Sequence, residues 1–251
     1  MNILAIDTAT EACSVALEVD NTLYTQFEVC PQQHSQRLLP MIDAILKEAD
    51  VELASLDLLA FGRGPGSFTG VRIATGMIQG LALGTGLPVA GVSTLKAMAV
   101  EAAQKSTGQF VAVASDARMG EVYFCVYKQS DDGLEIIVPE QVCPPTEAVN
   151  YLSELGEALN NNVIVAGTGW AAYDELQQWL NTQDAAESAA STVISTAANT
   201  EKKPAVTLPN AAFMLEDAKE AARANTTTSA AEVKPVYLRD KVTWKKLPGR
   251  E

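Results

Sequence analysis

Residues 3–19 read ILAIDTATEACSVALEV, a short apolar run that ends at Asp7, followed by a stretch in which apolar and polar residues alternate. The run predicts a buried strand, and the alternation predicts a half-buried strand beside it. Residues 110–127, FVAVASDARMGEVYFCVY, repeat this pattern roughly 105–112 residues later and place Asp116 where the first copy has Asp7. Solenoid repeats span only about 20–50 residues. The sequence therefore predicts two similar lobes.

The elements that follow each copy come in the same order. In the first half we expect a hairpin partner, a helix, a strand, a helix, a strand and a helix, at 23–29, 34–49, 58–61, 69–83, 88–92 and after Ser93. In the second half we expect a hairpin, a helix that Thr146 caps, a strand and a helix, at 121–127 with 134–138, 146–159, 163–166 and 171–180. Two βββαβα units indicate an α/β fold with two mixed sheets.

This reading divides the chain into three parts. Residues 1–106 form the N-terminal lobe, 107–209 the C-terminal lobe, and 210–251 a helix and a basic tail that pack back. The Ala-, Ser- and Thr-rich stretch 181–200 predicts a loose surface connection. Asn210 is expected to cap a helix that ends near Arg223, and 225–231 to be a polar linker. Residues 236–238 predict a short strand or a segment packed on a lobe.

Composition excludes several classes of protein. The chain has 251 residues, of which 47% are hydrophobic and 20% charged, as in globular proteins. No apolar run reaches 18 residues, so no membrane-spanning helix is expected, and a start without basic residues predicts a cytoplasmic location. Four cysteines without CxxC spacing predict reduced thiols. His34 is the only histidine, which excludes a multi-histidine metal site, and we expect no metal.

Asp7, with Thr8 and Thr10, lies between the first two predicted strands. Backbone N–H groups at such a turn can bind phosphates, and a carboxylate can hold hydrated Mg²⁺. Asp116 would face it from the second lobe, as in the phosphate clamp of the actin-, Hsp70- and hexokinase-like (ASKHA) class. Those hairpins carry glycines and this one has none, so an Asx-type turn is the alternative.

Glycine-rich loops follow one strand in each half. The first is GRGPGSFTG at 62–70, with Arg63, Gly64 and Gly66; the second is GTGW, with Gly167 and Gly169. Such loops can offer N–H groups to an anion at a helix N-terminus, with charge from Arg63 and Arg72. The spacing matches neither a P-loop nor GxGxxG, and a rigid turn is the other reading.

The helix after the first loop carries Gly76, Gly80 and Gly84 at intervals of four. Glycine costs a helix about 1 kcal/mol relative to alanine, so another backbone is expected to approach this stripe. Packing within the lobe and a subunit interface are both open. The interface would use this helix and the helix at 34–49, through the following residues: His34, Leu38, Met41, Ile42, Ile45, Arg72, Ile73, Gly76, Met77, Gly80 and Leu83.

The tail has a charge opposite to that of the whole chain. The net charge is −13, which repels nucleic acid on average, whereas residues 234–251 hold six basic residues and two acidic ones. Tyr237 and Trp244 lie among them. The tail is either a solvated end or a basic arm for an acidic partner or a phosphate backbone. The candidate residues for contact with such a phosphate backbone are Arg239, Lys241, Lys245 and Lys246.

Five strings occur together, in the order ILAIDTATEACSVAL, HSQRLLP, GPGSFTGVRI, SDARMGEVY and KPVYLRDKVTW. They closely resemble the TsaB (YeaZ) family of bacterial tRNA threonylcarbamoyladenosine biosynthesis subunits, over most of the chain except about 181–209. The resemblance implies an ASKHA-type fold and a role in modifying the adenosine beside the anticodon of ANN-reading tRNAs. It implies pairing with the paralogue TsaD, or with a second copy, through the two N-lobe helices, with TsaE and TsaC as further partners.

In that family TsaD carries out the transfer, and it has a metal-binding HxxxH where this chain has His34 and Leu38. The missing second histidine favours a non-catalytic subunit with no intrinsic cofactor, although ATP or ADP with Mg²⁺ could bind at the junction with the partner. An ATP-dependent transferase or kinase that uses Asp7 and Asp116 is one alternative. A glycoprotease-type peptidase is another alternative, but the sequence shows no base placed beside a nucleophile.

Overall fold

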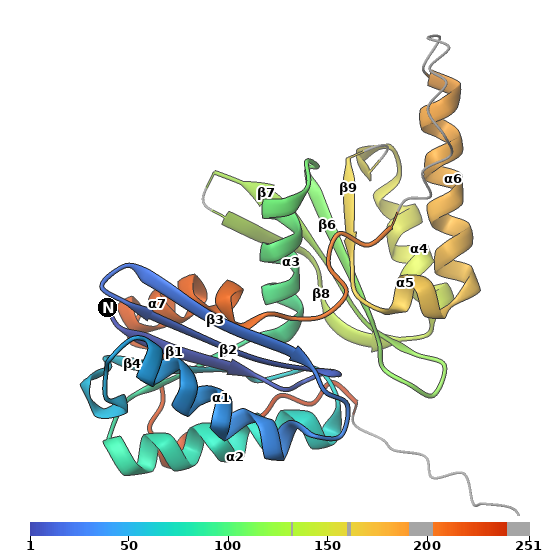
Figure 1. The fold of residues 1–251 in the computed structure, drawn as a ribbon. Coiled ribbons are helices and arrows are strands. Elements are labelled where there is room, and N and C mark those ends of the chain that lie inside the picture. Colours follow the sequence, from blue (N-terminus) through green and yellow to red (C-terminus); the bar gives the residue numbers. More distant parts are fainter. Residues whose placement is uncertain (132, 160–161, 191–202, 240–251) are drawn as a thin grey trace, which may run out of the picture.

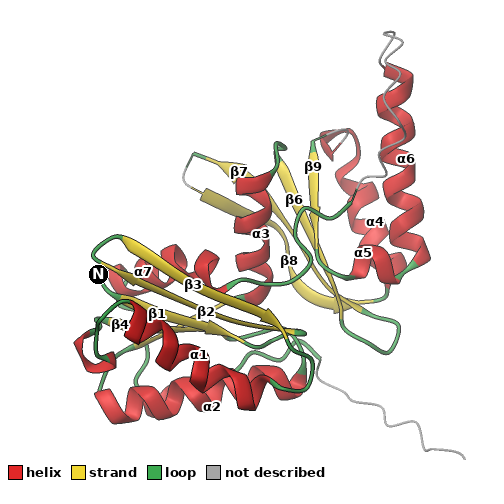
Figure 2. Cartoon of the chain, in the orientation of Figure 1, coloured by secondary structure: helices red, strands yellow, loops and turns green. Residues whose placement is uncertain are grey.

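The structure is a computed structural model, which describes residues 1–131, 133–159, 162–190 and 203–239 (Figure 1). Two mixed sheets, of five and four strands, each carry helices on both faces (Figure 2). In both sheets the first strand in the chain pairs antiparallel with the second and parallel with the fourth, and the second pairs antiparallel with the third. This shared order agrees with the strand pattern that repeats in the sequence.

The N-terminal sheet has the order β3-β2-β1-β4-β5, built from Thr22–Val29, Ala12–Val19, Ile3–Asp7, Leu58–Gly62 and Val89–Val92. Helices α1 (His34–Glu48) and α2 (Phe68–Thr85) cover one face. The short helix η3 (Ala211–Met214) and α7 (Leu215–Arg223) cover the other. Alternation along β2 explains the two layers, since Val15 and Leu17 face α1 while Ala16 faces η3 and α7.

The C-terminal sheet has the order β8-β7-β6-β9, from Gly133–Cys143, Val122–Ser130, Phe110–Asp116 and Val163–Ala166. One face is covered by α4 (Pro145–Leu155), α5 (Gly169–Ala172) and α6 (Asp174–Ala190). Helix α3 (Thr94–Lys105) covers the other face. Since Ala97 of α3 packs into the N-terminal lobe, α3 lies between the two sheets (Figure 1). Three short 3₁₀ helices complete the described part: Leu53–Ser55, Gly156–Leu159 and Ala230–Glu232.

Three expectations for the second half were wrong in detail. Thr146 does not cap α4, because the helix already begins at Pro145 after Pro144, and it ends at Leu155 before Gly156 at positive φ. The helix expected at 171–180 is two helices, broken at the extended residue Tyr173. Helix α6 continues to Ala190, into the stretch expected to be loose, because this stretch contains several good helix formers. The rest of that stretch lies outside the described residues.

The C-terminal segment returns to the N-terminal lobe. Asn210 caps the turn after it as predicted, since its side chain accepts from the N–H of Ala212 at 3.0 Å. Val236 donates to the carbonyl of Arg63 at 2.8 Å without forming a strand. All four cysteines are free and buried, as predicted. Within the described ranges, no helix has the length and apolar character needed to cross a membrane.

Candidate functional site

Asp7 ends β1 with no exposed surface. Its carboxylate accepts from the N–H of Ala9 at 2.9 Å and from the Thr94 hydroxyl at 3.3 Å. The first contact is the Asx-type turn that was the alternative reading. Burial raises the pKa of this carboxyl to about 7. A Cβ at Gly62 would lie 1.7 Å from the carboxylate oxygen, so β4 closes over it.

A cleft of about 570 Å³ lies between the lobes, and Asp7 is not on its wall. Thr10, Gly66 and His34 line one side, and Asp116, Arg118 and Thr168 the other. Asp116 is already paired, with Arg118 at 2.9 Å and the Tyr173 hydroxyl at 2.7 Å. The expectation that Asp7 faces Asp116 across an open cleft was therefore wrong, because Asp7 is buried against Gly62 and does not reach the cleft.

The glycine loops are packed against backbone. A Cβ at Gly66 would lie 2.4 Å from the Ala9 carbonyl oxygen, and one at Gly70 only 2.0 Å from that of Thr8. Gly167 and Gly169 pack in the same way against the carbonyl of Ala114, at 2.2 and 2.8 Å. These close approaches support the rigid-turn reading in both lobes. Gly64 has φ +97° and lies against the carbonyl of Val236.

The two arginines expected to supply an anion site are apart. Arg63 lines a second cleft on another side of the interlobe region, together with Lys96, Glu140 and Asp217. The guanidinium of Arg72 lies 3.3 Å above the ring centre of Phe68. The expectation that Arg63 and Arg72 together charge the loop was wrong, because each packs against a different part of the fold.

Several contacts between the lobes were not predicted. Arg118 forms an ion pair with Glu11 at 2.8 Å, and the Tyr123 hydroxyl donates to the carbonyl of Gly66 at 3.3 Å. Arg239 pairs with Glu121 and donates to the carbonyl of Arg118. The motif around Arg118 was visible in the sequence, but its partners are about a hundred residues away in the chain.

The interface predicted for α1 was wrong in its residues. Leu38, Met41, Ile42 and Ile45 form the face of α1 that packs on its own sheet, and His34 is also buried. An amphipathic helix beside a sheet ordinarily buries its apolar stripe there. The outer face of α1 instead presents Leu39, which is 51% exposed and was missed.

Helix α2 differs from α1. Gly76, Gly80 and Gly84 lie on its outer face, and a Cβ at any of them would meet no described atom within 4 Å. Leu83 beside them is 80% exposed, and Arg72 is exposed, while Ile73 and Met77 are half-buried. Packing on its own sheet or on α1 therefore does not explain the glycines.

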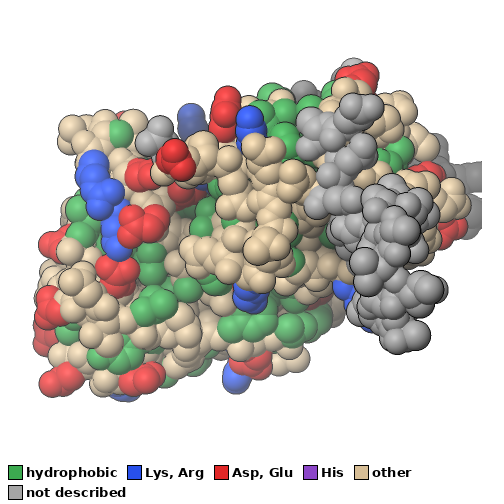
Figure 3. Space-filling view, turned by 90° about the horizontal axis from the view of Figure 1, so that it is seen from above, with side chains coloured by type: hydrophobic (Ala, Val, Ile, Leu, Met, Phe, Trp, Pro, Cys, Tyr) green, Lys and Arg blue, Asp and Glu red, His purple; other side chains and the backbone are tan. Residues whose placement is uncertain are grey.

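The acidic character of the chain is visible on the face seen in Figure 3, where Asp and Glu side chains are spread beside a few lysines and arginines. Of the predicted tRNA-contacting residues, Arg239 forms the contacts given above. Lys241, Lys245 and Lys246 lie outside the described residues.

Comparison with known proteins gives three kinds of match. The family model for TsaD, tRNA N6-adenosine threonylcarbamoyltransferase, matches residues 20–247. The tRNA threonylcarbamoyladenosine biosynthesis proteins TsaB of Haemophilus influenzae and Escherichia coli K12 are 44% and 43% identical over this whole chain, and the matches cover 99% and 100% of theirs. The solved structure of YeaZ from Pseudomonas aeruginosa is 36% identical and covers 94% of this chain and 99% of its own, with a TM-score of 0.76. These matches confirm the predicted ASKHA-type α/β fold.

Proposed function

The chain belongs to the TsaB family, and from this premise we propose that it is a non-catalytic subunit in the formation of threonylcarbamoyladenosine in tRNA. In this proposal it binds TsaD, the transferase described by the matching family model, and supports its activity together with TsaE. TsaC supplies the activated threonylcarbamoyl group, and tRNA is reached through the assembled complex. When alone, the chain pairs with a second copy.

The outer face of α2 is the observation that carries this proposal. Three exposed glycines cost the helix about 1 kcal/mol each relative to alanine, and no contact within the described residues explains them. A second helix that packs against them would gain close backbone contact in return. Leu83 on α2 and Leu39 on α1 add exposed apolar surface on the two helices. This combination favours a protein partner over the solvent.

The described residues do not fit a nucleotide with Mg²⁺ in the cleft between the lobes. Asp7 is buried and hydrogen-bonded within its own lobe, and Asp116 is paired with Arg118 and Tyr173. The loop glycines that would form an anion site pack against carbonyl groups instead. These contacts speak against the transferase or kinase alternative. A nucleotide at the junction with TsaD stays a prediction, because it needs residues of the partner.

The peptidase alternative also lacks support in the geometry. Among the described residues, no three His, Cys, Asp or Glu side chains are grouped in a way that could hold a metal ion. His34, the single histidine, is buried, and its Nε2 atom has no hydrogen-bond partner among the described residues. This atom therefore makes no hydrogen bond to a described serine, threonine or cysteine, as a base beside a nucleophile would.

Co-purification with TsaD tests the interface. Gly80→Leu places a side chain in open space, so folding should persist while the clash with a closely packed partner helix abolishes binding. Ser153→Leu is the matched control, since it adds a leucine to an exposed position of α4 in the other lobe. Undiminished TsaD binding by the Gly80 variant would remove the interface from this face of α2.

Reconstituted tRNA modification tests the role. With TsaD, TsaE and TsaC present, modification should require this chain and should persist with Asp116→Asn. A variant that still binds TsaD but fails to support modification would show that the cleft acts in the reaction and would contradict a purely supporting role.

A further inference from the structure

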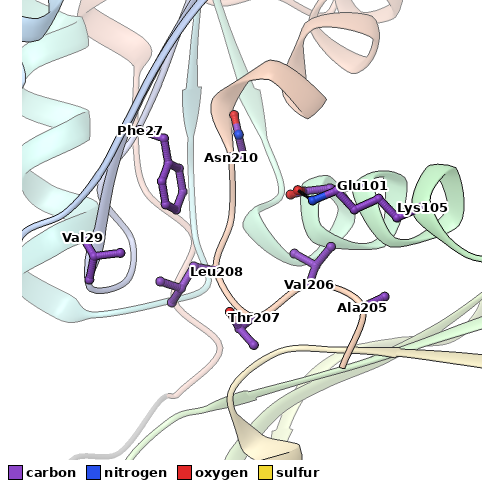
Figure 4. A pocket seen from close by; sticks show the side chains of 9 residues that line it. All are labelled: Phe27, Val29, Glu101, Lys105, Ala205, Val206, Thr207, Leu208 and Asn210. Carbon is purple, nitrogen blue, oxygen red and sulfur yellow. Dashed lines mark hydrogen bonds and ion pairs between the residues drawn. The ribbon is translucent and has the colours of Figure 1, made fainter. Parts of the chain in front are cut away.

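A groove of about 460 Å³ on another side of the molecule is not used by the proposed function. Phe27 and Val29 of β3 form one wall, and α3 and the segment that includes Val206 and Leu208 form the rest (Figure 4). Three of its features point to the same kind of ligand.

The first feature is a carboxylate with an unused acceptor. Glu101 of α3 is only 5% exposed. Its Oε1 atom pairs with Lys105 at 2.5 Å, whereas its Oε2 atom has no hydrogen-bond partner among the described residues. A buried polar atom left unpaired costs about 1–3 kcal/mol, more when it is charged. A cationic group on the ligand would remove this cost.

The second feature is the free edge of the N-terminal sheet. β3 is the outermost strand and pairs only with β2 among the described strands. Its other edge therefore presents backbone N–H and C=O groups that an extended peptide can pair with. Glu28 faces α1, where it binds Arg37, so Phe27 and Val29 point to the opposite side, toward the groove.

The third feature is apolar surface beside the carboxylate. Phe27 is 45% exposed and Val29 is 56% exposed, although both are large apolar residues. Together with Val206 and Leu208 they can pack against the methylene groups of a long side chain whose charged end reaches Glu101. Lysine has this combination of an apolar stem and a cationic end.

We propose that this groove docks an extended segment of a partner protein, which pairs with the edge of β3 and inserts a lysine side chain beside Glu101. The net charge of −13 favours the approach of a basic segment. This site does not involve the outer face of α2, and it can be tested on the isolated chain.

The first test uses the blocked peptide acetyl-Thr-Val-Thr-Lys-Thr-Val-Thr-amide, labelled for fluorescence anisotropy, and the full chain. The same peptide with norleucine in place of lysine keeps the stem and removes the charge. We expect the norleucine peptide to bind about tenfold more weakly, since hydrogen bonds to charged groups contribute more than neutral ones. No binding of the lysine peptide at about 1 mM, or equal binding of the two peptides, would overturn the proposal.

The second test asks whether the peptide binds as a strand. Methylating the backbone nitrogens of alternate residues gives two peptides, of which only one loses the groups that face β3. One methylated peptide should lose binding and the other should keep it. Equal binding of both, or displacement of the labelled peptide by the same concentration of n-butylamine, would show that no strand docks there.

Variants of the chain then locate the site. Glu101→Gln should lower affinity for the lysine peptide by about tenfold and leave affinity for the norleucine peptide unchanged. Phe27→Ala should lower the affinity for both peptides. Ile136→Ala is the matched control, because it removes an exposed apolar side chain from β8 instead. If Ile136→Ala weakens binding as much as Phe27→Ala, the groove is not the site. Should Glu101→Gln fail to fold, the peptide comparisons on the unchanged chain still decide.

Discussion

The glycines at the start of α2 and before it differ sharply from the glycines on its outer face. Gly62, Gly66 and Gly70 each lie so close to another part of the same lobe that a Cβ would come within 2.4 Å of a neighbouring atom. Gly76, Gly80 and Gly84 follow in the same segment, and a Cβ there would meet nothing described within 4 Å. One residue type thus serves close packing inside the lobe at the first three positions, and at the other three it has no use within it.

This difference separates what holds the lobe together from what is available to a partner. Substitutions at the packed glycines should lower the stability of the chain, whereas substitutions at the outer glycines should raise its stability and lower its affinity for a partner. The following predictions can break or sharpen this contrast, beginning with the largest effect.

The packed region should give the chain an unusual response to pH. Asp7 lies under Gly62, and its pKa is raised from 3.8 to about 7 by burial. In the unfolded chain it ionises near pH 4, so the protonated folded form loses stability as the pH rises from about 4 to about 7, and no further above that. The loss should reach about 4 kcal/mol at most.

Urea unfolding at several pH values, compared with Asp7→Asn, measures this term. The difference in the free energy of unfolding between the two proteins should change across this interval, since other carboxyl groups titrate equally in both. A difference that stays constant between pH 4 and 7 would mean that Asp7 is not buried as described.

Gly70→Ala should destabilise the chain by about 3 kcal/mol, because the added methyl group would lie 2.0 Å from the carbonyl oxygen of Thr8 and force the hairpin turn to move. The midpoint of urea unfolding reports the change. A loss below the uncertainty of the measurement would show that the turn is not rigid.

Gly80→Ala should act in the opposite direction. The helix gains about 1 kcal/mol, so the isolated chain should melt at a higher temperature, while affinity for TsaD should fall. Thermal unfolding and a binding titration with the same protein measure both. If Gly80→Ala is destabilised instead, the outer face of α2 must make a contact that the described residues do not show.

The smallest effect is expected for Arg118, which bridges the lobes but is 74% exposed on its side chain. Arg118→Gln should change the free energy of unfolding by less than about 1 kcal/mol, since water screens exposed ion pairs. High salt should reduce this difference further. A larger loss that salt does not reduce would show that the cleft is closed by this arginine and not by packing.

The sequence predicted the strands well because alternation and apolar runs follow directly from which faces are buried. It also predicted α1 and α2, the helices before β4 and after the first glycine loop. It could not tell which glycines pack against backbone, because Gly66 and Gly80 look alike until their neighbours in space are known. The apolar face of α1 was assigned to a partner for the same reason, since Leu38 and Ile45 suit a sheet and an interface equally.

Two further differences have separate causes, one local and one tertiary. Thr146 is a good capping residue, but Pro145 fits the first turn of a helix, so α4 begins before the threonine. Asp7 and Asp116 occupy matching places in the repeat, yet burial and hydrogen bonding differ between the two lobes. Spacing along the chain carries no information about either property.

The return of the C-terminal segment to the first lobe bears on how the chain is made. The face of the N-terminal sheet that contains Ala5 and Ala60 is covered by Met214 and Leu215, and Ser14 accepts a hydrogen bond from the N–H of Ala211 across 197 residues. While the chain is being synthesised, that face cannot be covered until residue 215 and its neighbours have left the ribosome. The lobe that is made first is therefore completed last, and a nascent chain halted after the second sheet would expose its apolar face to chaperones.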